Sequence, residues 1–271
     1  MTIDVDYLPP DIPAGKDSVC VVIDVLRASS TIAALFDKGS REVWLTNDID
    51  GFLANHSGER NESLVVCAES VAGYCLEGAD FGPSLEDMAG NNMMAGKNVL
   101  MQTTNGTVAV HTLIKRGKDK IFIGCMRNAT TVMKAAVDMA GHNSTGIHIV
   151  CAGREAGTSY TIDDVYCAAW LVERAMAVAQ ETGVTLDLND SAKLALMTLR
   201  YFDSAWHAFD ASASGAIMRK VDRPGDIELC AMDDVSQSVP VLQGYTTEGY
   251  LRLVPFKWLQ THRQKKEEAH V

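Results

Sequence analysis

Residues 19–30 read VCVVIDVLRASS: five consecutive apolar residues, then Asp24, then a polar run that leads into a helical pattern. A short β-branched run of this kind predicts a strand buried on both faces. Similar runs occur at residues 42–45, 64–67, 98–102, 120–124 and 146–151. Helical periodicity follows several of them, at residues 30–38, 107–116, 129–139 and 162–180. The alternation predicts a layered α/β/α fold with a substantially parallel or mixed sheet.

Glycines mark the expected helix ends. Gly39, Gly117, Gly141 and Gly183 each follow a helical run, which is the common position of a C-terminal cap. A longer helical stretch is expected at residues 191–211, and further strands at 228–232 and 250–254. No linker rich in Ser, Pro or Gly interrupts the chain. We therefore expect residues 1–271 to form one unit, with a division into two subdomains left open and residues 262–271 as a frayed, charged tail.

Composition and charge limit the partners. The chain is 47% hydrophobic and 22% charged, as in globular proteins, and carries a formal net charge of −11. This charge repels phosphate backbones, so neither nucleic acid nor an anionic membrane is expected as a partner. The sequence shows no apolar run of about 18 residues and no signal-peptide pattern at its N-terminus, which favours a cytoplasmic location.

The cysteines and histidines indicate which metal to expect. Seven cysteines are scattered without a C-x-x-C motif, and the seven histidines are equally dispersed. This pattern is typical of free thiols in a reducing compartment and not of a zinc site. A metal in this protein would therefore be a hard cation held by oxygen, Mg²⁺ before Zn²⁺.

Polar clusters stand where predicted strands run into predicted helices. There are four such junctions, at residues 23–30, 102–107, 125–131 and 151–164. The carboxyl ends of parallel strands lie at one edge of a sheet, where helix N-termini present free N–H groups and a positive dipole end. We expect an anionic ligand at this edge.

Asp24 is the first candidate at this edge. It follows five apolar residues, so its carboxylate is expected to be half removed from water, which costs several kcal/mol unless a cation compensates it. The cation is either Arg27, in a structural ion pair, or a metal. The sequence favours the metal slightly.

The run Thr103-Thr104-Asn105-Gly106-Thr107 has two interpretations. Threonine hydroxyls and free N–H groups suit phosphate oxygens, and Gly106 allows close approach to the backbone. Alternatively, Asn105 or Thr104 caps the following helix. Asn128 has the same two interpretations.

Two further sets of charges are candidates. Asp163 and Asp164 form a carboxylate pair, yet Thr161 to Asp164 also fits a capping box, and for Asp164 capping is favoured over catalysis. Arg154 and Arg127 stand at strand ends, where each either contacts an anion or remains a solvated surface charge. P-loop, G-x-S-x-G and H-E-x-x-H motifs are absent.

Four motifs in one order carry a family resemblance: VVIDVLRAS at 21–29, TTNGT at 103–107, CAGRE at 151–155, and ELCAMDD followed by VP within 228–240. Together they resemble the 2-phosphosulfolactate phosphatase family, from residue 19 to about residue 240. The resemblance implies an α/β/α enzyme that uses Mg²⁺ to hydrolyse a small phosphorylated acid, 2-phosphosulfolactate, to sulfolactate and phosphate in coenzyme M synthesis. A homodimer is left open.

The resemblance implies roles for Asp24, Arg27, Thr104 to Thr107, Asn128, Asp163 and Asp164, and the junctions described above complete the expected site. Asp24, Arg27 and Asp163 are the expected catalytic residues, and Asp24 or Asp163 either orients the attacking water or attacks phosphorus itself. Mg²⁺ would be held by Asp24 with Glu69 or Asp80. The expected substrate-binding residues are Thr104, Asn105, Gly106, Thr107, Asn128 and Arg154.

The chain departs from the family pattern at two places. Ala68-Glu69-Ser70 stands where we expect Gly-Glu-Arg, and Gly82-Pro83-Ser84-Leu85 where we expect Gly-Asn-Ser-Pro. Losing a bidentate arginine weakens anion binding by roughly 1.5–3 kcal/mol if nothing compensates. Two alternatives are therefore kept: a phosphatase for another small organic phosphate, and an anion-binding relative without turnover.

Overall fold

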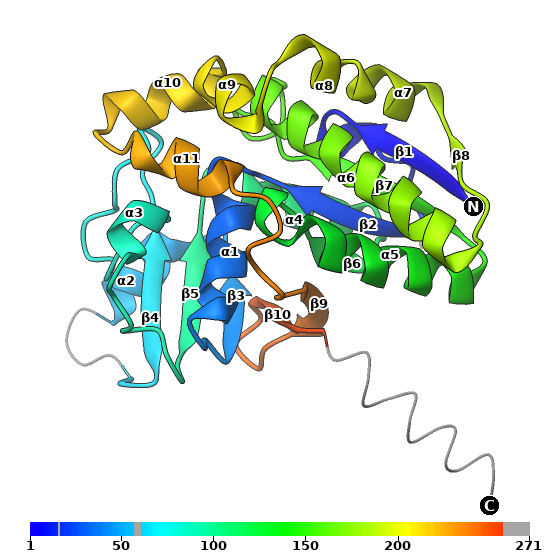
Figure 1. Ribbon diagram of the computed structural model, residues 1–271. Helices are drawn as coiled ribbons and strands as arrows, with labels where there is room; N and C mark the ends of the chain where they lie inside the picture. The colour runs from blue at the N-terminus through cyan, green and yellow to red at the C-terminus, as the bar shows by residue number, and fades with distance from the viewer. Residues whose placement is uncertain (16, 57–60, 257–271) are drawn as a thin grey trace, which may run out of the picture.

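The computed structural model describes residues 1–15, 17–56 and 61–256, and its described strands form one sheet between helices (Figure 1). The strands are β1 (Thr2–Asp6), β2 (Ser18–Ile23), β3 (Glu42–Leu45), β4 (Leu64–Ala68), β5 (Asn98–Gln102), β6 (Ile121–Ile123), β7 (Gly146–Cys151), β8 (Asp187–Leu188), β9 (Pro240–Tyr245) and β10 (Leu251–Pro255). The predicted tail, residues 262–271, lies outside the described residues.

The helices alternate with the strands through most of the chain. The α-helices are α1 (Ala28–Asp37), α2 (Ile49–Asn55), α3 (Leu85–Met88), α4 (Gly106–Lys115), α5 (Ala129–Asn143), α6 (Ile162–Thr182), α7 (Asp190–Leu196), α8 (Thr198–Tyr201), α9 (Ala205–Asp210), α10 (Ala213–Lys220) and α11 (Gly225–Ala231). Two 3₁₀ turns, η1 (Pro9–Asp11) and η2 (Met126–Asn128), complete the elements of the described chain. The α/β class predicted from the sequence is confirmed.

The sheet contains two sets of parallel strands. Its order is β4-β5-β3-β10-β9-β6-β2-β7-β1-β8. Strands β4, β5 and β3 are parallel to one another, as are β6, β2, β7, β1 and β8. The hairpin β9–β10 joins the sets and is antiparallel to β6 and to β3. The sheet is therefore mixed, and its two sets lie at a steep angle to each other (Figure 1).

Burial explains why the β2 segment forms a central strand. All six residues of β2 are buried, because β6 and β7 flank it and helices pack on it. The strands predicted at residues 42–45, 98–102 and 146–151 have the observed bounds. Gly183, with φ of +72°, ends α6 in the left-handed conformation expected of a glycine cap.

Three sequence predictions about elements are wrong. Residues 228–232 were predicted as a strand but belong largely to α11, in which Ile227 and Cys230 are buried at helical spacing. The stretch 191–211 is broken into α7, α8 and α9. Gly141 lies inside α5, and Ser144 caps that helix. Short apolar runs do not distinguish strand from helix by periodicity alone, which explains the first error.

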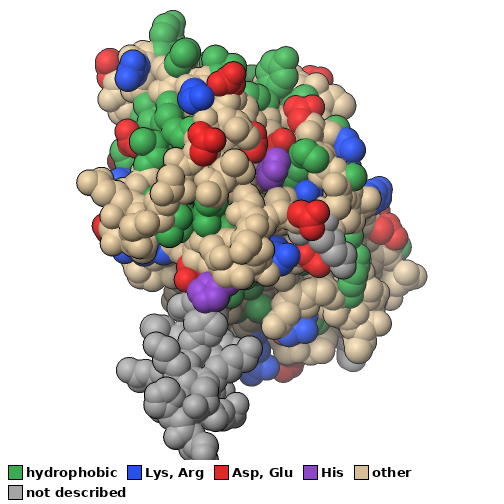
Figure 2. All heavy atoms as spheres, turned by 90° about the vertical axis from the view of Figure 1, so that its right-hand side faces the viewer, with side chains coloured by type: hydrophobic (Ala, Val, Ile, Leu, Met, Phe, Trp, Pro, Cys, Tyr) green, Lys and Arg blue, Asp and Glu red, His purple; other side chains and the backbone are tan. Residues whose placement is uncertain are grey.

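Three further features concern the helices, the cysteines and the surface. No helix among the described residues is long and apolar enough to cross a membrane. All seven cysteines are free, and six of them are buried. On the face shown in Figure 2, acidic and basic side chains are interspersed with hydrophobic ones.

Candidate active site

Loops that follow β2, β4, β5 and β7 meet at one place. Thr104 donates from its backbone N–H and its hydroxyl to Glu69 Oε1, both at 3.3 Å, which joins the loops after β5 and β4. Asp164 Oδ1 accepts from Val25 N and Oδ2 from Gly153 N, both at 2.9 Å. Two further bonds join one parallel set to the other. Arg27 Nη2, after β2, donates to Glu69 Oε2, after β4, at 3.0 Å, and Ala156 N, after β7, donates to Asn105 Oδ1, after β5, at 3.3 Å. The ends of both parallel sets therefore meet, although an antiparallel hairpin separates the sets in the sheet.

Asp24 lies at the carboxyl end of β2 and is buried. Burial raises the pKa of Asp24 to about 7, and the charges of Glu69 and Asp163 add to this, while the N–H groups of Gly106 and Ala28 partly offset it. Gly106 fits against it because a Cβ at that position would lie 2.8 Å from Asp24 Oδ2. The site therefore holds a carboxylate that is costly to ionise.

Arg27 does not supply the missing charge to Asp24. Its Nη1 donates to Asp226 Oδ2 at 3.0 Å, and its Nη2 donates to Glu69 Oε2 at 3.0 Å and to the Gly73 carbonyl at 2.7 Å. The structural pair of Asp24 with Arg27, one of the two alternatives, is therefore not formed among the described residues.

Asp226 is a site residue that the sequence reasoning missed. Fully buried at the start of α11, it also accepts from Ser84 Oγ at 3.0 Å and from Glu86 N at 2.9 Å. An acidic residue in the first turn of a helix ordinarily complements the helix dipole, so the sequence offered no reason to assign Asp226 to a functional site. Asp226 holds the segment that departs from the family pattern, residues 82–85, beside Arg27.

Asp163 and Asp164 differ in their surroundings. Both oxygens of Asp164 tie loops together, and the Thr161 side chain makes no capping bond, so the capping prediction for Asp164 is wrong. Asp163 Oδ1 is buried and has no hydrogen-bond partner among the described residues. Burial raises the pKa of Asp163. Hydrogen bonding from the hydroxyls of Thr161, Ser214 and Ser212 to this carboxylate partly offsets the rise.

The threonine run serves two purposes. Thr103 Oγ1 accepts from Thr107 N at 3.2 Å and Thr107 Oγ1 from Thr103 N at 3.0 Å, so this pair caps α4. Neither Asn105 nor Thr104 makes the side-chain cap that one interpretation expected. Asn105 Oδ1 accepts instead from Ala156 N, in the loop after β7, at 3.3 Å.

Three predicted residues lie apart from Asp24 or carry no bond to it. Asn128 is fully buried, accepts from Cys125 N and donates to the carbonyls of Ile123 and Ser238. Asp80 accepts a hydrogen bond from Val66 N on β4. Val66 comes three residues before Glu69, so the backbone positions of these two residues are about 10 Å apart along the strand. Arg154 has no side-chain hydrogen bond or ion pair within the described chain, and its loop adjoins Asn105 through Ala156.

Comparison with known proteins identifies the family. The family model described as 2-phosphosulpholactate phosphatase matches residues 7–245. The chain belongs to this family. A probable 2-phosphosulfolactate phosphatase of Deinococcus radiodurans is 30% identical over 89% of this chain and 93% of its own length. Proteins with the same description from Thermus thermophilus and Synechocystis are 29% and 28% identical, over 93% and 81% of this chain and 98% and 87% of their own lengths.

The donor set in this family member suits Mg²⁺. No group of three or more His, Cys, Asp or Glu side chains in the described chain is arranged to hold a metal ion. Mg²⁺, however, is commonly bound by one or two carboxylates together with waters and substrate phosphate. Asp24 and Glu69 supply oxygen donors only, and Glu69 is near enough to raise the pKa of Asp24. A cation at this position would relieve that repulsion, so the residues fit the ion.

The charges and helix ends at this edge favour an anionic ligand only with such a cation. The carboxylates outnumber the cations: besides burial, Glu69 and Asp163 raise the pKa of Asp24, and Asp163 and Asp24 raise that of Asp164, while the Arg27 guanidinium is paired with Glu69 and Asp226. The N-termini of α1, α4 and α6 also meet here, and their dipoles stabilise negative charge. Two pockets of about 1040 and 640 Å³ lie elsewhere, since their linings include none of these residues. The candidate active site therefore lies outside both of these pockets.

Proposed function

We propose that this chain is a phosphatase that hydrolyses 2-phosphosulfolactate to sulfolactate and phosphate with the help of Mg²⁺. One observation carries the proposal: the segment matched by the family, residues 7–245, contains every loop that meets at the Asp24 edge. The names of the relatives support the substrate, and the helix N-termini that meet at this edge support the binding of a phosphate group.

Each residue at the edge has a proposed role. Asp24 and Glu69 would hold Mg²⁺, which when bound neutralises charge on the phosphate. Arg27 fixes the Glu69 carboxylate through Oε2, and the N-termini of α4 and α6 attract the phosphate oxygens. The unpartnered Oδ1 of Asp163 accepts the proton of the attacking water.

One observation supports a second candidate, a phosphatase for another small organic phosphate. Ser70 stands where the family pattern leads us to expect arginine, and its N–H donates to the Tyr74 carbonyl in a tight turn beside Glu69. An enzyme without this cation would bind a doubly anionic acid less tightly. It would then release phosphate faster from esters that carry no sulfonate.

The test is phosphate release from 2-phosphosulfolactate and from matched esters without the sulfonate, each with Mg²⁺ and with EDTA. We expect release that needs Mg²⁺, and a loss of about 10²–10⁴-fold in kcat for Asp163→Asn. Asp80→Asn is the matched control, because Asp80 lies away from the edge. Full activity in EDTA or in Asp24→Asn would remove the metal role. Thermal stabilisation by the ester without any release would indicate a binding protein.

A further inference from the structure

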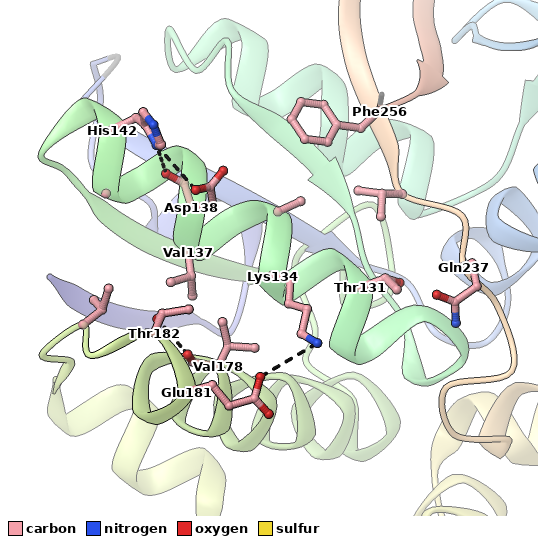
Figure 3. Close-up of a pocket in the computed structure, with 14 residues that line it drawn as sticks. Thr131, Lys134, Val137, Asp138, His142, Val178, Glu181, Thr182, Gln237 and Phe256 are labelled. Atoms are coloured by element: carbon pink, nitrogen blue, oxygen red, sulfur yellow. Dashed lines mark hydrogen bonds and ion pairs between the residues drawn. The ribbon is translucent and has the colours of Figure 1, made fainter. Parts of the chain in front are cut away.

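A depression of about 1040 Å³ crosses the outer side of α5. We call it the α5 groove. Its apolar wall comes from Ala135 and Val137 on α5, Val178 on α6, and Val239 and Phe256 next to the hairpin. Figure 3 shows Val137 and Val178 on the side of α5 that faces α6, and Phe256 on the opposite side. A depression of this volume has room for several side chains.

The described chain ends inside the lining of this groove. Phe256 is the last described residue, its N–H donates to the Val239 carbonyl at 2.8 Å, and its ring packs edge-on against Phe122 with centroids 5.3 Å apart. Residues 257–271 follow, and Trp258 and Leu259 stand two and three positions after Phe256. Two residues span at most about 7 Å, so Trp258 can reach the groove without a long connecting loop.

Length and charge both match this segment to the groove. From Thr131 to His142, α5 extends about 17 Å, and the 15 residues after Phe256 are long enough to follow it. The rim carries charges of both signs, since Asp138 lies 3.5 Å from His142 and Glu181 lies 3.9 Å from Lys134. The protein as a whole has a net charge of −11, which is opposite in sign to Arg263, Lys265 and Lys266 of the segment.

We propose that residues 257–266 of this same chain pack along the α5 groove. The Trp258 and Leu259 side chains cover the apolar wall, and the basic residues that follow lie toward Asp138 and Glu181 at the rim. The segment would thereby fasten the end of the hairpin strand β10 to α5. A second copy of the chain is the alternative occupant.

The first experiment monitors Trp258 in the full-length chain. The difference between the fluorescence of the wild type and of Trp258→Phe isolates this residue from the other three tryptophans. We expect a blue-shifted emission that is shielded from acrylamide and does not change on dilution. Ala135→Gln places a polar side chain in the groove and should shift the emission to the red and increase quenching. Ala177→Gln, on the exposed side of α6, is the control and should change neither.

The second experiment measures whether the effects of substituting Trp258 and Ala135 on stability depend on each other. Trp258→Ala should lower the Tm by about 3–6 °C, as expected for a partly buried aromatic residue in a chain of this size. In the double variant with Ala135→Gln, the loss should not exceed the larger of the two single losses, because both remove the same contact. Losses that add, or a Trp258 emission typical of water, would overturn the proposal. An emission that shifts on dilution, together with a dimer that Ala135→Gln dissociates, would assign the groove to a second copy and overturn it as well.

Discussion

At the scale of single residues, the site is built on a carboxylate that is expensive to ionise. Sequence reasoning identified Asp24, because an acidic residue directly after five apolar ones is conspicuous. It could not identify the neighbours of Asp24, because Glu69 and Asp163 are distant from it in sequence. These two carboxylates repel the Asp24 carboxylate, whereas one sequence-based alternative was an ion pair at this position. The cation of that alternative, Arg27, is instead committed to Glu69 and Asp226.

This arrangement predicts that Asp24→Asn stabilises the metal-free protein at alkaline pH. The pKa of Asp24 is raised from its usual value to about 7, so between about pH 4 and pH 7 the native state holds a proton that the unfolded state has released. Stability contributed by this group is therefore lost as pH rises through 7. Asparagine removes the penalty, which amounts to at most about 4 kcal/mol above pH 7 and vanishes below pH 4.

Thermal unfolding in EDTA between pH 4 and pH 8 measures this effect. The gain in Tm for Asp24→Asn should grow with pH. Asp203→Asn, whose side chain is 94% exposed, serves as the control and should show no such trend. A gain that stays constant across this range, or that grows toward acid pH, would show that Asp24 does not carry the penalty.

A second prediction at this scale concerns Asp226. Asp226→Ala leaves the buried Arg27 with one carboxylate, and removes the acceptor for Ser84 Oγ and Glu86 N. We expect a loss of about 3–5 kcal/mol in the free energy of unfolding, because breaking a buried pair leaves an uncompensated charge. Urea denaturation measures it, with Asp210→Ala as the comparison for an ion pair that is partly exposed. A loss no larger than in the comparison would mean that Asp226 does not hold Arg27.

At the scale of elements, the junctions between strands and helices were predictable and their capping was not. Alternating apolar and helical periodicity located the ends of β2, β5 and β7, so the run at 103–107 was recognised as a helix start. The cap of α4 is formed by the reciprocal hydrogen bonds of Thr103 and Thr107. Hydrophobic periodicity contains no information about such side-chain bonds. For the same reason Asp164 was taken for a cap, although its bonds join two loops.

Gly106 shows how closely two elements approach. A Cβ there would lie 2.7 Å from Ala28 Cβ on α1 and 2.8 Å from Asp24 Oδ2, so Gly106→Ala must push the start of α4 away from Asp24. We expect a loss of about 1–3 kcal/mol in stability, typical of overpacking, together with reduced phosphatase activity. Denaturant unfolding and the phosphate-release assay measure the two effects.

Gly141→Ala is the matched control for this prediction. Gly141 also lies in a helix, α5, and the nearest atom to a Cβ there is Met1 Cε at 3.8 Å. Alanine should therefore stabilise the protein by up to about 1 kcal/mol, since it lowers the entropy cost of helix formation. If Gly106→Ala behaved like this control, the close packing of α4 on Asp24 would be disproved.

At the scale of the whole molecule, the mixed sheet is what brings distant loops together. The sequence predicted α/β layers and allowed a mixed sheet, but the order of the strands was beyond it. Strand β9 was not anticipated, and the β10 segment was seen only as an isolated strand at 250–254. Their pairing with β6 and β3 depends on contacts more than a hundred residues apart in sequence, for which local patterns contain no information.

Because the β9–β10 hairpin connects the two sets of parallel strands, we predict that both sets unfold together. Leu253 in β10 is fully buried and is paired with Val43 of β3 and Leu242 of β9, so Leu253→Ala removes core packing at the joint itself. It should cost about 2–5 kcal/mol. Native-state hydrogen exchange should show the same loss of protection for the amides of β5 and of β2, one from each set, because neither set can keep its packing without the joint. Gln243→Ala, exposed on the same hairpin, should change neither. If protection falls in β5 and persists in β2, the two sets are separate folding units, and the Asp24 edge would then lie between them.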